Sequence, residues 1–334
     1  MLDDRKVKVF RCIVEDFIKS AEPVGSKNLI IKYNLPYSSA TIRNDMMYLE
    51  ELGYLEKTHT SSGRVPSIMG YRYYCEHLMD NRVDEKLELQ LKGIFDDGSV
   101  DLDDIIKNSC DILSDMVNLT AGALGLNSSD HLLEHIKLFP IDDKSAICVF
   151  ITNSGHVENR MFNFDNNISI VDIQICCDIL NDRLKGTKLG EVVEKMELLR
   201  PLLSEKVQKY ELLFNMFIKA FVRFASDSVY FSGKNNLLYQ PEYADVERLK
   251  GLMKMLESEE GWRDLSHISS TMALDTIKGT KLIWLDDLAV ISSSFTIDKQ
   301  KGQLMVVGPP RMDYDKIVGM LEYLASIIED RYRR

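Results

Sequence analysis

Hydrophobic residues near the start of the chain recur at the spacing of one helix face. Between residues 4 and 20 this face consists of Val7, Phe10, Ile13, Val14 and Phe17. Such spacing, with charged residues between the apolar ones, predicts an amphipathic helix over residues 4–20. The segment EPVGS then interrupts the pattern and ends the helix.

Two shorter helices follow within the first 55 residues. Ser26 can cap a helix over SKNLIIKYN, which the segment LPYS ends. Ser38 or Ser39 can cap a third helix that runs to Leu52, and Gly53 then provides its C-terminal stop. We therefore expect three helices before the first strand.

Short extended segments come next. YLEKT and RVPS flank the segment HTSSG, which predicts a small hairpin, and SIMGYRYYCEHLMDN reads as a further helix. Three helices, a hairpin and a closing helix are the layout of a winged helix-turn-helix.

Strands and helices alternate in blocks through the rest of the chain. Apolar runs at 136–141, 146–152 and 157–164 predict strands, residues 168–225 read as helices, and strands resume after residue 280. This order indicates an α+β fold with an inserted helical subdomain. The predicted domains are a winged-helix domain at 1–80, a connection at 81–103, a larger α/β domain at 104–167 and 235–334, and an inserted helical domain at 168–234.

The third helix has two chemically different sides. Ile42, Met46 and Leu49 fall on the side that would face the other helices. The opposite side and the N-terminal turn offer small, amide and guanidinium side chains, which recognition helices present to base edges. A solvated helix face is the alternative. The candidate DNA-binding residues here are Ser38, Ser39, Ala40, Thr41, Arg43, Asn44 and Met47.

The predicted hairpin strengthens the DNA-binding interpretation. Its tip would form a wing whose last residue, Arg64, reaches the DNA backbone or minor groove. The candidate wing residues are His59, Thr60, Ser61, Ser62, Gly63 and Arg64.

Charge is distributed unevenly between the two parts of the chain. The net charge is −11, yet residues 1–80 contain 11 basic and 11 acidic side chains, so the excess acid lies in the remaining residues. An acidic surface is repelled by DNA, which leaves residues 1–80 as the candidate nucleic-acid surface.

Six scattered cysteines without a CxxC pair indicate buried thiols in a reducing cytoplasm.

Enzymatic chemistry finds no support in the sequence. The segment HLLEH at 131–135 matches an inverted zinc-protease motif, but it lies where at most two helical turns fit, so we interpret its histidines as surface or packing residues. No phosphate-binding loop, dinucleotide fingerprint or nucleophile elbow occurs. We expect no catalytic residue, no bound metal and no cofactor.

Several long segments resemble one known family. The stretch from EPVGSKNLIIKYNLPYSSATIRNDMMYLEELGYLEKTHTSSGRVPS to CEHLM, and the segments ITNSGHVENR, NDRLKG, NNLLYQPEYADVERLKGLMKMLE and VVGPPRMDYDKIVGMLEYL, resemble the heat-inducible transcription repressor family, HrcA. The resemblance covers nearly the whole chain. It departs from the family pattern at IKGTKLIWLDDL, residues 277–288, where a glycine-rich segment is expected.

The resemblance implies a cytoplasmic, dimeric bacterial repressor without enzymatic activity. It also implies that the larger domain, at 104–167 and 235–334, is GAF-like and that the inserted domain at 168–234 is a dimerising domain. Such a protein binds an inverted-repeat operator upstream of the groE and dnaK chaperone operons, and the chaperonin GroEL maintains its active form. The alternative is a DNA-binding regulator gated by a small molecule in its GAF-like domain.

The segment YELLFNMFIKAFVRFA is apolar on more than one side of the predicted helix, so we expect it to hold the dimer together. A helix central to its own subdomain core would give the same pattern. The candidate dimerisation residues are Leu213, Phe214, Phe217, Phe221 and Phe224.

Overall fold

The chain divides into two compact units. One contains Met1–Gly125 together with Val229–Arg334, and the other contains Leu126–Ser228. We call residues 2–80 the head, residues 102–125 with 229–332 the body, and residues 131–225 the insert. The computed structural model describes residues 2–57, 63–80, 88, 102–125, 131–142, 144–153, 155, 157–164, 169–208, 210–225, 229–267, 272–276, 278–297 and 300–332.

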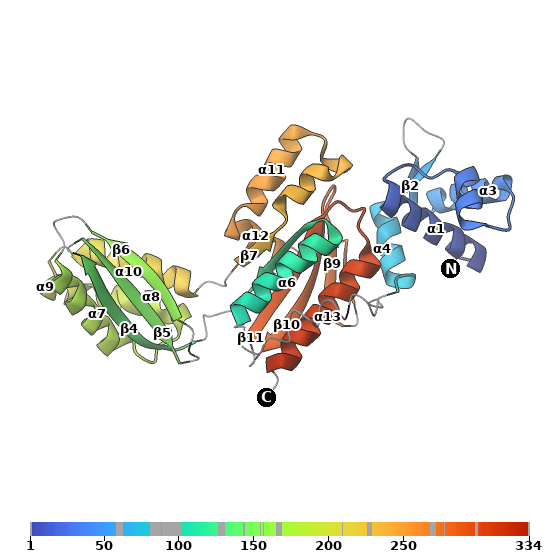
Figure 1. Ribbon diagram of the computed structural model, residues 1–334. Helices are drawn as coiled ribbons and strands as arrows, with labels where there is room; N and C mark the ends of the chain where they lie inside the picture. The colour runs from blue at the N-terminus through green and yellow to red at the C-terminus, as the bar shows by residue number, and fades with distance from the viewer. Residues whose placement is uncertain are drawn as a thin grey trace. The chain divides into compact units, whose positions relative to one another are not determined.

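The head contains the predicted three helices, hairpin and closing helix (Figure 1). Ser38 caps the third helix as predicted, because its Oγ accepts a hydrogen bond from the Thr41 amide, and Gly53 follows it with a positive φ. Gly25, and not Ser26, precedes the second helix as its N-cap. The elements are α1 (Asp4–Ser20), α2 (Ser26–Tyr33), α3 (Ser39–Glu51), β1 (Leu55–Lys57), β2 (Arg64–Pro66) and α4 (Ile68–His77).

The core of the head comes from the apolar faces read in the sequence. Phe10, Ile13 and Val14 of α1 are fully buried, as are Ile42 and Leu49 of α3. Hydrophobic burial therefore fixes the rotation of α3 about its axis and determines which of its side chains reach solvent.

A six-stranded antiparallel sheet forms the centre of the body, in the order β7-β3-β11-β10-β9-β8. Its strands are β3 (Thr120–Leu124), β7 (Val229–Ser232), β8 (Ala273–Asp275), β9 (Thr280–Trp284), β10 (Ala289–Ile297) and β11 (Gln300–Gly308). The helices are α6 (Leu102–Val117), α11 (Val246–Leu256), α12 (Glu259–His267) and α13 (Tyr314–Tyr332), with short 3-10 turns η2 (Lys234–Tyr239) and η3 (Pro241–Tyr243).

Helices cover both faces of this sheet. The helices α6 and α13 lie over one face (Figure 1). On the other face, Leu256 of α11 and Trp262 of α12 pack in one cluster with Met305 of β11. The ring of Trp262 occupies the space beside Gly122, where a Cβ atom would approach it to 2.2 Å. Gly122 therefore permits the close approach of α12 to the sheet.

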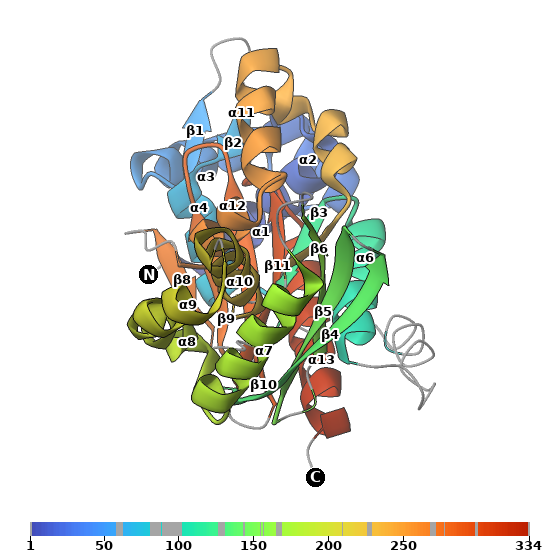
Figure 2. The same ribbon diagram turned by 90° about the vertical axis from the view of Figure 1, so that its left-hand side faces the viewer.

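The insert is a two-layer domain of sheet and helix. It contains β4 (Leu133–Asp142), β5 (Ser145–Thr152), β6 (Val157–Asn163), α7 (Ile170–Leu184), α8 (Leu189–Leu198), α9 (Arg200–Lys206) and α10 (Tyr210–Ala225). The strands pair antiparallel in the order β4-β5-β6, and the helices lie on one side of them (Figure 2).

These boundaries correct the domain prediction. The strands of residues 133–163 belong to the insert and not to the larger domain, so the insert is a mixed α/β unit and not a helical one. The division of the chain at residues 167 and 234 was wrong for this reason. The prediction that the chain as a whole combines helices and sheet in an α+β fold is confirmed.

The five predicted dimerisation residues are core residues of the insert. Phe217 and Phe221 are fully buried, and both rings lie against Phe150 of β5, with centroids 6.4 and 5.0 Å away. The prediction that these side chains meet a second copy was therefore wrong, because they already fill the space between helix and sheet. All five are at most 2% exposed: Leu213, Phe214, Phe217, Phe221 and Phe224.

All six cysteines are buried and none forms a disulfide, so the prediction of buried thiols is confirmed. Burial raises the pKa of the Cys110 and Cys176 thiols, which keeps them protonated and unreactive. Among the described residues no helix is long and apolar enough to cross a membrane.

Replacing Phe217 with alanine should destabilise the insert by about 3–5 kcal/mol, because it leaves a cavity between α10 and the sheet. Leu212→Ala on the same helix is the control, because this side chain is 55% exposed and its loss should change stability little. Urea unfolding followed by circular dichroism measures both. Equal midpoints for the two variants would contradict the buried position of Phe217.

Candidate nucleic-acid interface

The exposed side of α3 contains the residues that the sequence placed there. Ala40, Arg43, Asn44 and Met47 are exposed, whereas Ile42, on the opposite side, is fully buried. Arg43 and Asn44 make no side-chain hydrogen bond or ion pair within the described part of the chain. The guanidinium and amide donors of this face are therefore available to an external acceptor.

Hydroxyl groups organise the N-terminal turn of α3. Ser38 Oγ caps the helix and also lies 2.8 Å from Thr41 Oγ1. Ser39 Oγ lies 2.9 Å from Ser26 Oγ, the first residue of α2. Three of the predicted contact residues, Ser38, Ser39 and Thr41, thus have structural partners. The hydrogen bond between Ser39 and Ser26 holds α2 and α3 together at their N-terminal ends.

A buried carboxylate fixes α3 to α1. Asp45 is 3% exposed and accepts two hydrogen bonds from Arg5, at 2.9 Å from Nε and 3.0 Å from Nη2. The hydrogen bond and the charge of Asp45 raise the pKa of the Arg5 guanidinium. Such two-point geometry fixes orientation as well as distance, so α3 cannot rotate without breaking the pair.

The hairpin is attached to the head at its base. The backbone of Arg64 pairs with Val24, with N–H to O distances of 2.9 and 3.0 Å. Gly63, one of the candidate wing residues, is buried and does not have a positive φ. A Cβ atom at this position would lie 2.8 Å from the backbone of Pro23, so only glycine allows the approach.

The side chain of Arg64 lies against α3. Its Nη2 is 2.7 Å and its Nε 2.8 Å from Oε2 of Glu50, and the side chain is only 13% exposed. The sequence predicted that Arg64 reaches toward DNA from the wing. In the structure its guanidinium instead has a carboxylate partner within the head. Arg64 thus ties the hairpin to the C-terminal half of α3. The remaining predicted wing residues, His59, Thr60, Ser61 and Ser62, lie outside the described residues.

Sequence reasoning missed the acidic partners in this region. Asp45 lies next to Met46 on the buried side of α3. A charged residue on the buried side of a helix is almost always paired, so its position in the sequence could have indicated an ion pair. Glu50 gives no comparable signal, because it lies at the edge of the buried face and its partner is 14 residues away.

A small helical head with an exposed, firmly oriented helix, joined to a larger mixed α/β body, is typical of multidomain transcription regulators. The family described as "HrcA protein C terminal domain" matches residues 103–318. The chain therefore belongs to the HrcA family of heat-inducible transcription repressors.

Full-length relatives agree with this assignment. The chain is 36% identical to "Heat-inducible transcription repressor HrcA" of Bacillus pumilus (strain SAFR-032), over 98% of this chain and 96% of that protein. It is 35% identical to the protein of the same name from Shouchella clausii (strain KSM-K16), over 99% and 98%. A crystal structure of a hypothetical protein has the same overall fold, with a TM-score of 0.69, 22% identity and 99% of both chains covered.

Replacing Gly63 with alanine should lower the stability of the head, because the added methyl group clashes with the backbone of Pro23. We expect a loss of about 1–3 kcal/mol, the usual range for overpacking. Gly251→Ala in α11 is the control, because a Cβ there meets no atom within 4 Å. Thermal unfolding of both variants provides the test, and a Gly63→Ala variant as stable as the parent would exclude this packing.

Proposed function

We propose that this protein represses transcription by binding an inverted-repeat operator as a homodimer, with the head as a winged helix-turn-helix. In this proposal α3 is the recognition helix, the β1–β2 hairpin is the wing, and the body is a GAF-like domain that carries the head. The protein would act in the bacterial cytoplasm and catalyse no reaction.

The exposed face of α3 is the observation that carries the proposal. Arg43 and Asn44 lie one turn from the N-terminus of the helix, solvent-exposed and without partners among the described residues. An arginine can donate two hydrogen bonds to a guanine edge, and an asparagine can bond both ways to adenine. Ala40, one turn earlier, would permit close approach to the major groove.

The wing would contribute mainly through its position. Because Arg64 is held by Glu50, we propose that it orients the hairpin beside α3, and that it reaches phosphate only if this ion pair opens. The hairpin tip, with His59, Thr60, Ser61 and Ser62, remains a proposed contact to the DNA backbone.

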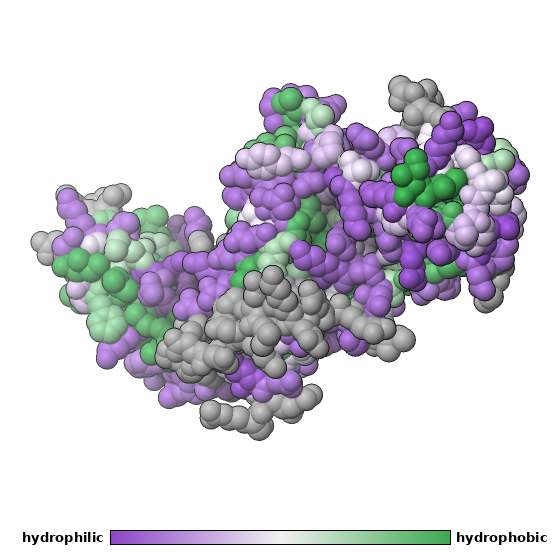
Figure 3. Space-filling view, turned by 45° about the vertical axis from the view of Figure 1, so that its right-hand side comes forward, coloured by the Kyte–Doolittle hydropathy of each residue, from purple (hydrophilic) through white to green (hydrophobic). Residues whose placement is uncertain are grey.

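An inverted repeat requires two heads related by a two-fold axis, so a dimer contact must lie outside the head. We propose the outer face of the three-stranded sheet in the insert. Phe139, Ile141, Val157 and Met161 are each about half exposed, between 46% and 58%. Figure 3 shows hydrophobic residues, in green, on the surface of the insert at the left of the view.

The register of the strands makes this face continuous. Phe139 of β4 lies opposite Ile147 of β5, and Ile147 lies opposite Met161 of β6, so one apolar row crosses all three strands. Ile151 and Val157 form a second such pair. A flat apolar face can pack on its own copy about a two-fold axis, as sheets do in sandwiches.

The proposed target genes and the proposed role of GroEL rest on the family resemblance. We propose operators upstream of the groE and dnaK operons and an active form that GroEL maintains. Operator affinity measured with and without GroEL tests this part. An affinity that follows a metabolite and ignores GroEL would favour a small-molecule sensor in the body.

Replacing Arg43 with alanine should abolish specific operator binding without unfolding the head, because the side chain is exposed. If the contact is bidentate, the loss should be about 1–3 kcal/mol per half-site. Lys250→Ala in α11 is the matched control, because it removes the same charge from an exposed position of the body. Titration by mobility shift measures both, and an unchanged affinity for Arg43→Ala would remove this residue from base recognition.

Replacing Met161 or Phe139 with glutamate should convert the dimer into a folded monomer with weak operator affinity, because a charge would enter an apolar interface. Leu198→Glu in α8 is the control, because it places the same charge at a 77% exposed position on the helical side of the insert. Sedimentation measures the mass of each variant. If both sheet variants remain dimeric, the interface lies elsewhere.

A further inference from the structure

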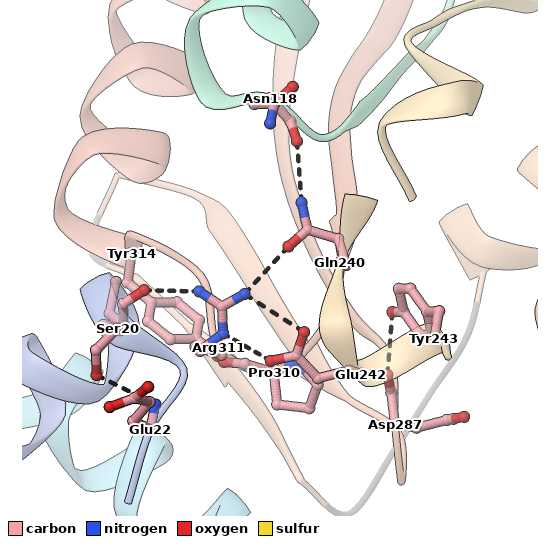
Figure 4. A network of polar contacts seen from close by, with 11 residues as sticks. Ser20, Glu22, Asn118, Gln240, Glu242, Tyr243, Asp287, Pro310, Arg311 and Tyr314 are labelled. Atoms are coloured by element: carbon pink, nitrogen blue, oxygen red, sulfur yellow. Dashed lines mark hydrogen bonds and ion pairs between the residues drawn. The ribbon is translucent and has the colours of Figure 1, made fainter. Parts of the chain in front are cut away.

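Arg311 joins three separate segments of the chain. It lies in the motif GPPRMDY, between β11 and α13, and its side chain is 14% exposed. Nη1 donates to the carbonyl oxygen of Ile18 in the head at 2.7 Å, and Nε donates to Oε1 of Glu242 at 2.6 Å. Nη2 donates to Gln240 Oε1 at 3.2 Å, and Figure 4 shows the guanidinium beside Gln240 and Glu242.

The contact with Ile18 completes the C-terminal end of α1. The last four carbonyl groups of a helix have no amide partner within it. The amide that would bond to Ile18, that of Glu22, instead donates to Ser20 Oγ at 3.1 Å. Arg311 supplies the missing donor and places a positive charge at the negative end of the helix dipole, where cations are stabilising. The body therefore caps a helix of the head.

A second contact, four residues later, holds another helix of the head. Tyr74 of α4 donates its hydroxyl to Asp315 Oδ2 at 2.6 Å, and the Asp80 amide donates to the other carboxylate oxygen. Beside this contact the rings of Tyr71 and Tyr314 lie 5.6 Å apart.

The body side of this contact is itself rigid. Tyr314 is fully buried, and its hydroxyl accepts a hydrogen bond of 2.8 Å from Trp284 Nε1 in the sheet. Asp315 is in the first turn of α13. The segment 311–315 is thus fixed to the sheet and holds both α1 and α4.

We propose that the segment Arg311–Asp315 locks the orientation of the head on the body, and that Arg311 thereby determines which half-site spacing the dimer accepts. This inference rests on the proposed operator function. An added base pair rotates one half-site by about 35° relative to the other, because B-DNA has about 10 bp per turn. A locked head cannot follow this rotation, whereas a head released from Arg311 can.

Only a guanidinium fits the three acceptors at once. Its planar fork points separate N–H groups at Ile18, Glu242 and Gln240, whereas an ammonium group is a compact charge that cannot span them. Arg311→Lys should therefore keep the charge and lose part of the contact with α1. Arg311→Ala should lose this contact entirely and leave the head held only through Tyr314 and Asp315.

The experiment compares operators with the native spacer and with spacers one or two base pairs longer or shorter. For Arg311→Ala we expect about a tenfold loss on the native operator, within the usual range of coupling between sites, and similar affinities for all spacers. Arg311→Lys should lie between this variant and the parent. Lys316→Ala is the control, because Lys316 Nζ donates to the Met116 carbonyl oxygen inside the body, and among the described residues its side chain makes no hydrogen bond or ion pair with the head.

Hydrogen exchange of the DNA-free protein provides an independent measurement. Loss of the lock should accelerate exchange at the end of α1, including the Ala21 amide that bonds to Phe17. Unchanged exchange, or a parent-like spacer preference in both Arg311 variants, would overturn the inference. If the parent protein bound no operator while Arg311→Ala still changed exchange, the proposed function would fail and the lock would stand.

Discussion

The pairing of β3 with β7 is the constraint on which the organisation of the chain depends. The chain leaves the body sheet after Leu124 and returns at Val229, and these two residues are direct partners in the antiparallel ladder. About a hundred residues can therefore be inserted without interrupting the sheet, because both ends of the insertion lie on neighbouring strands. The insert has its own hydrophobic core as a result, and the body keeps a continuous six-stranded sheet.

This pairing also explains which parts of the fold the sequence could predict. The head was predictable because its signals are local: the caps at Ser38 and Gly53 flank α3, and the apolar spacing around Phe10 lies within α1 itself. The boundary of the insert was not, because nothing local distinguishes β4 from a strand of the body. Only the partner of each strand decides the assignment: β4 pairs with β5 inside the insert, whereas the body strand β3 pairs with β7 and β11, which lie far along the chain.

The helix α10 shows a second limit of sequence patterns. An apolar surface wider than one stripe means that the helix is covered on more than one side, but the pattern does not name what covers it. In the insert, Phe217 meets Phe162 of the sheet, whereas Phe214 lies under the guanidinium of Arg200 at the start of α9. Neighbours from the same domain account for the burial on both sides. The candidate site had the same limit: α3 exposes the residues expected, yet the ion pairs through Asp45 and Glu50 required the tertiary structure.

If α3 is the recognition helix, as proposed, the charge of the head makes its orientation as important as this helix. Residues 1–80 have no net charge, and several of their cations are already paired internally: Arg5 with Asp45, Lys32 with Asp16, and Arg64 with Glu50. The head therefore has no excess of positive charge to attract phosphates, although phosphate contacts supply much of the affinity of any DNA-binding protein. One head alone should bind weakly. Two linked heads gain affinity through their effective concentration, but only if the geometry lets both bind at once. In the proposed repressor, the affinity of α3 for bases therefore becomes useful only through the dimer contact and the contacts that hold each head on its body.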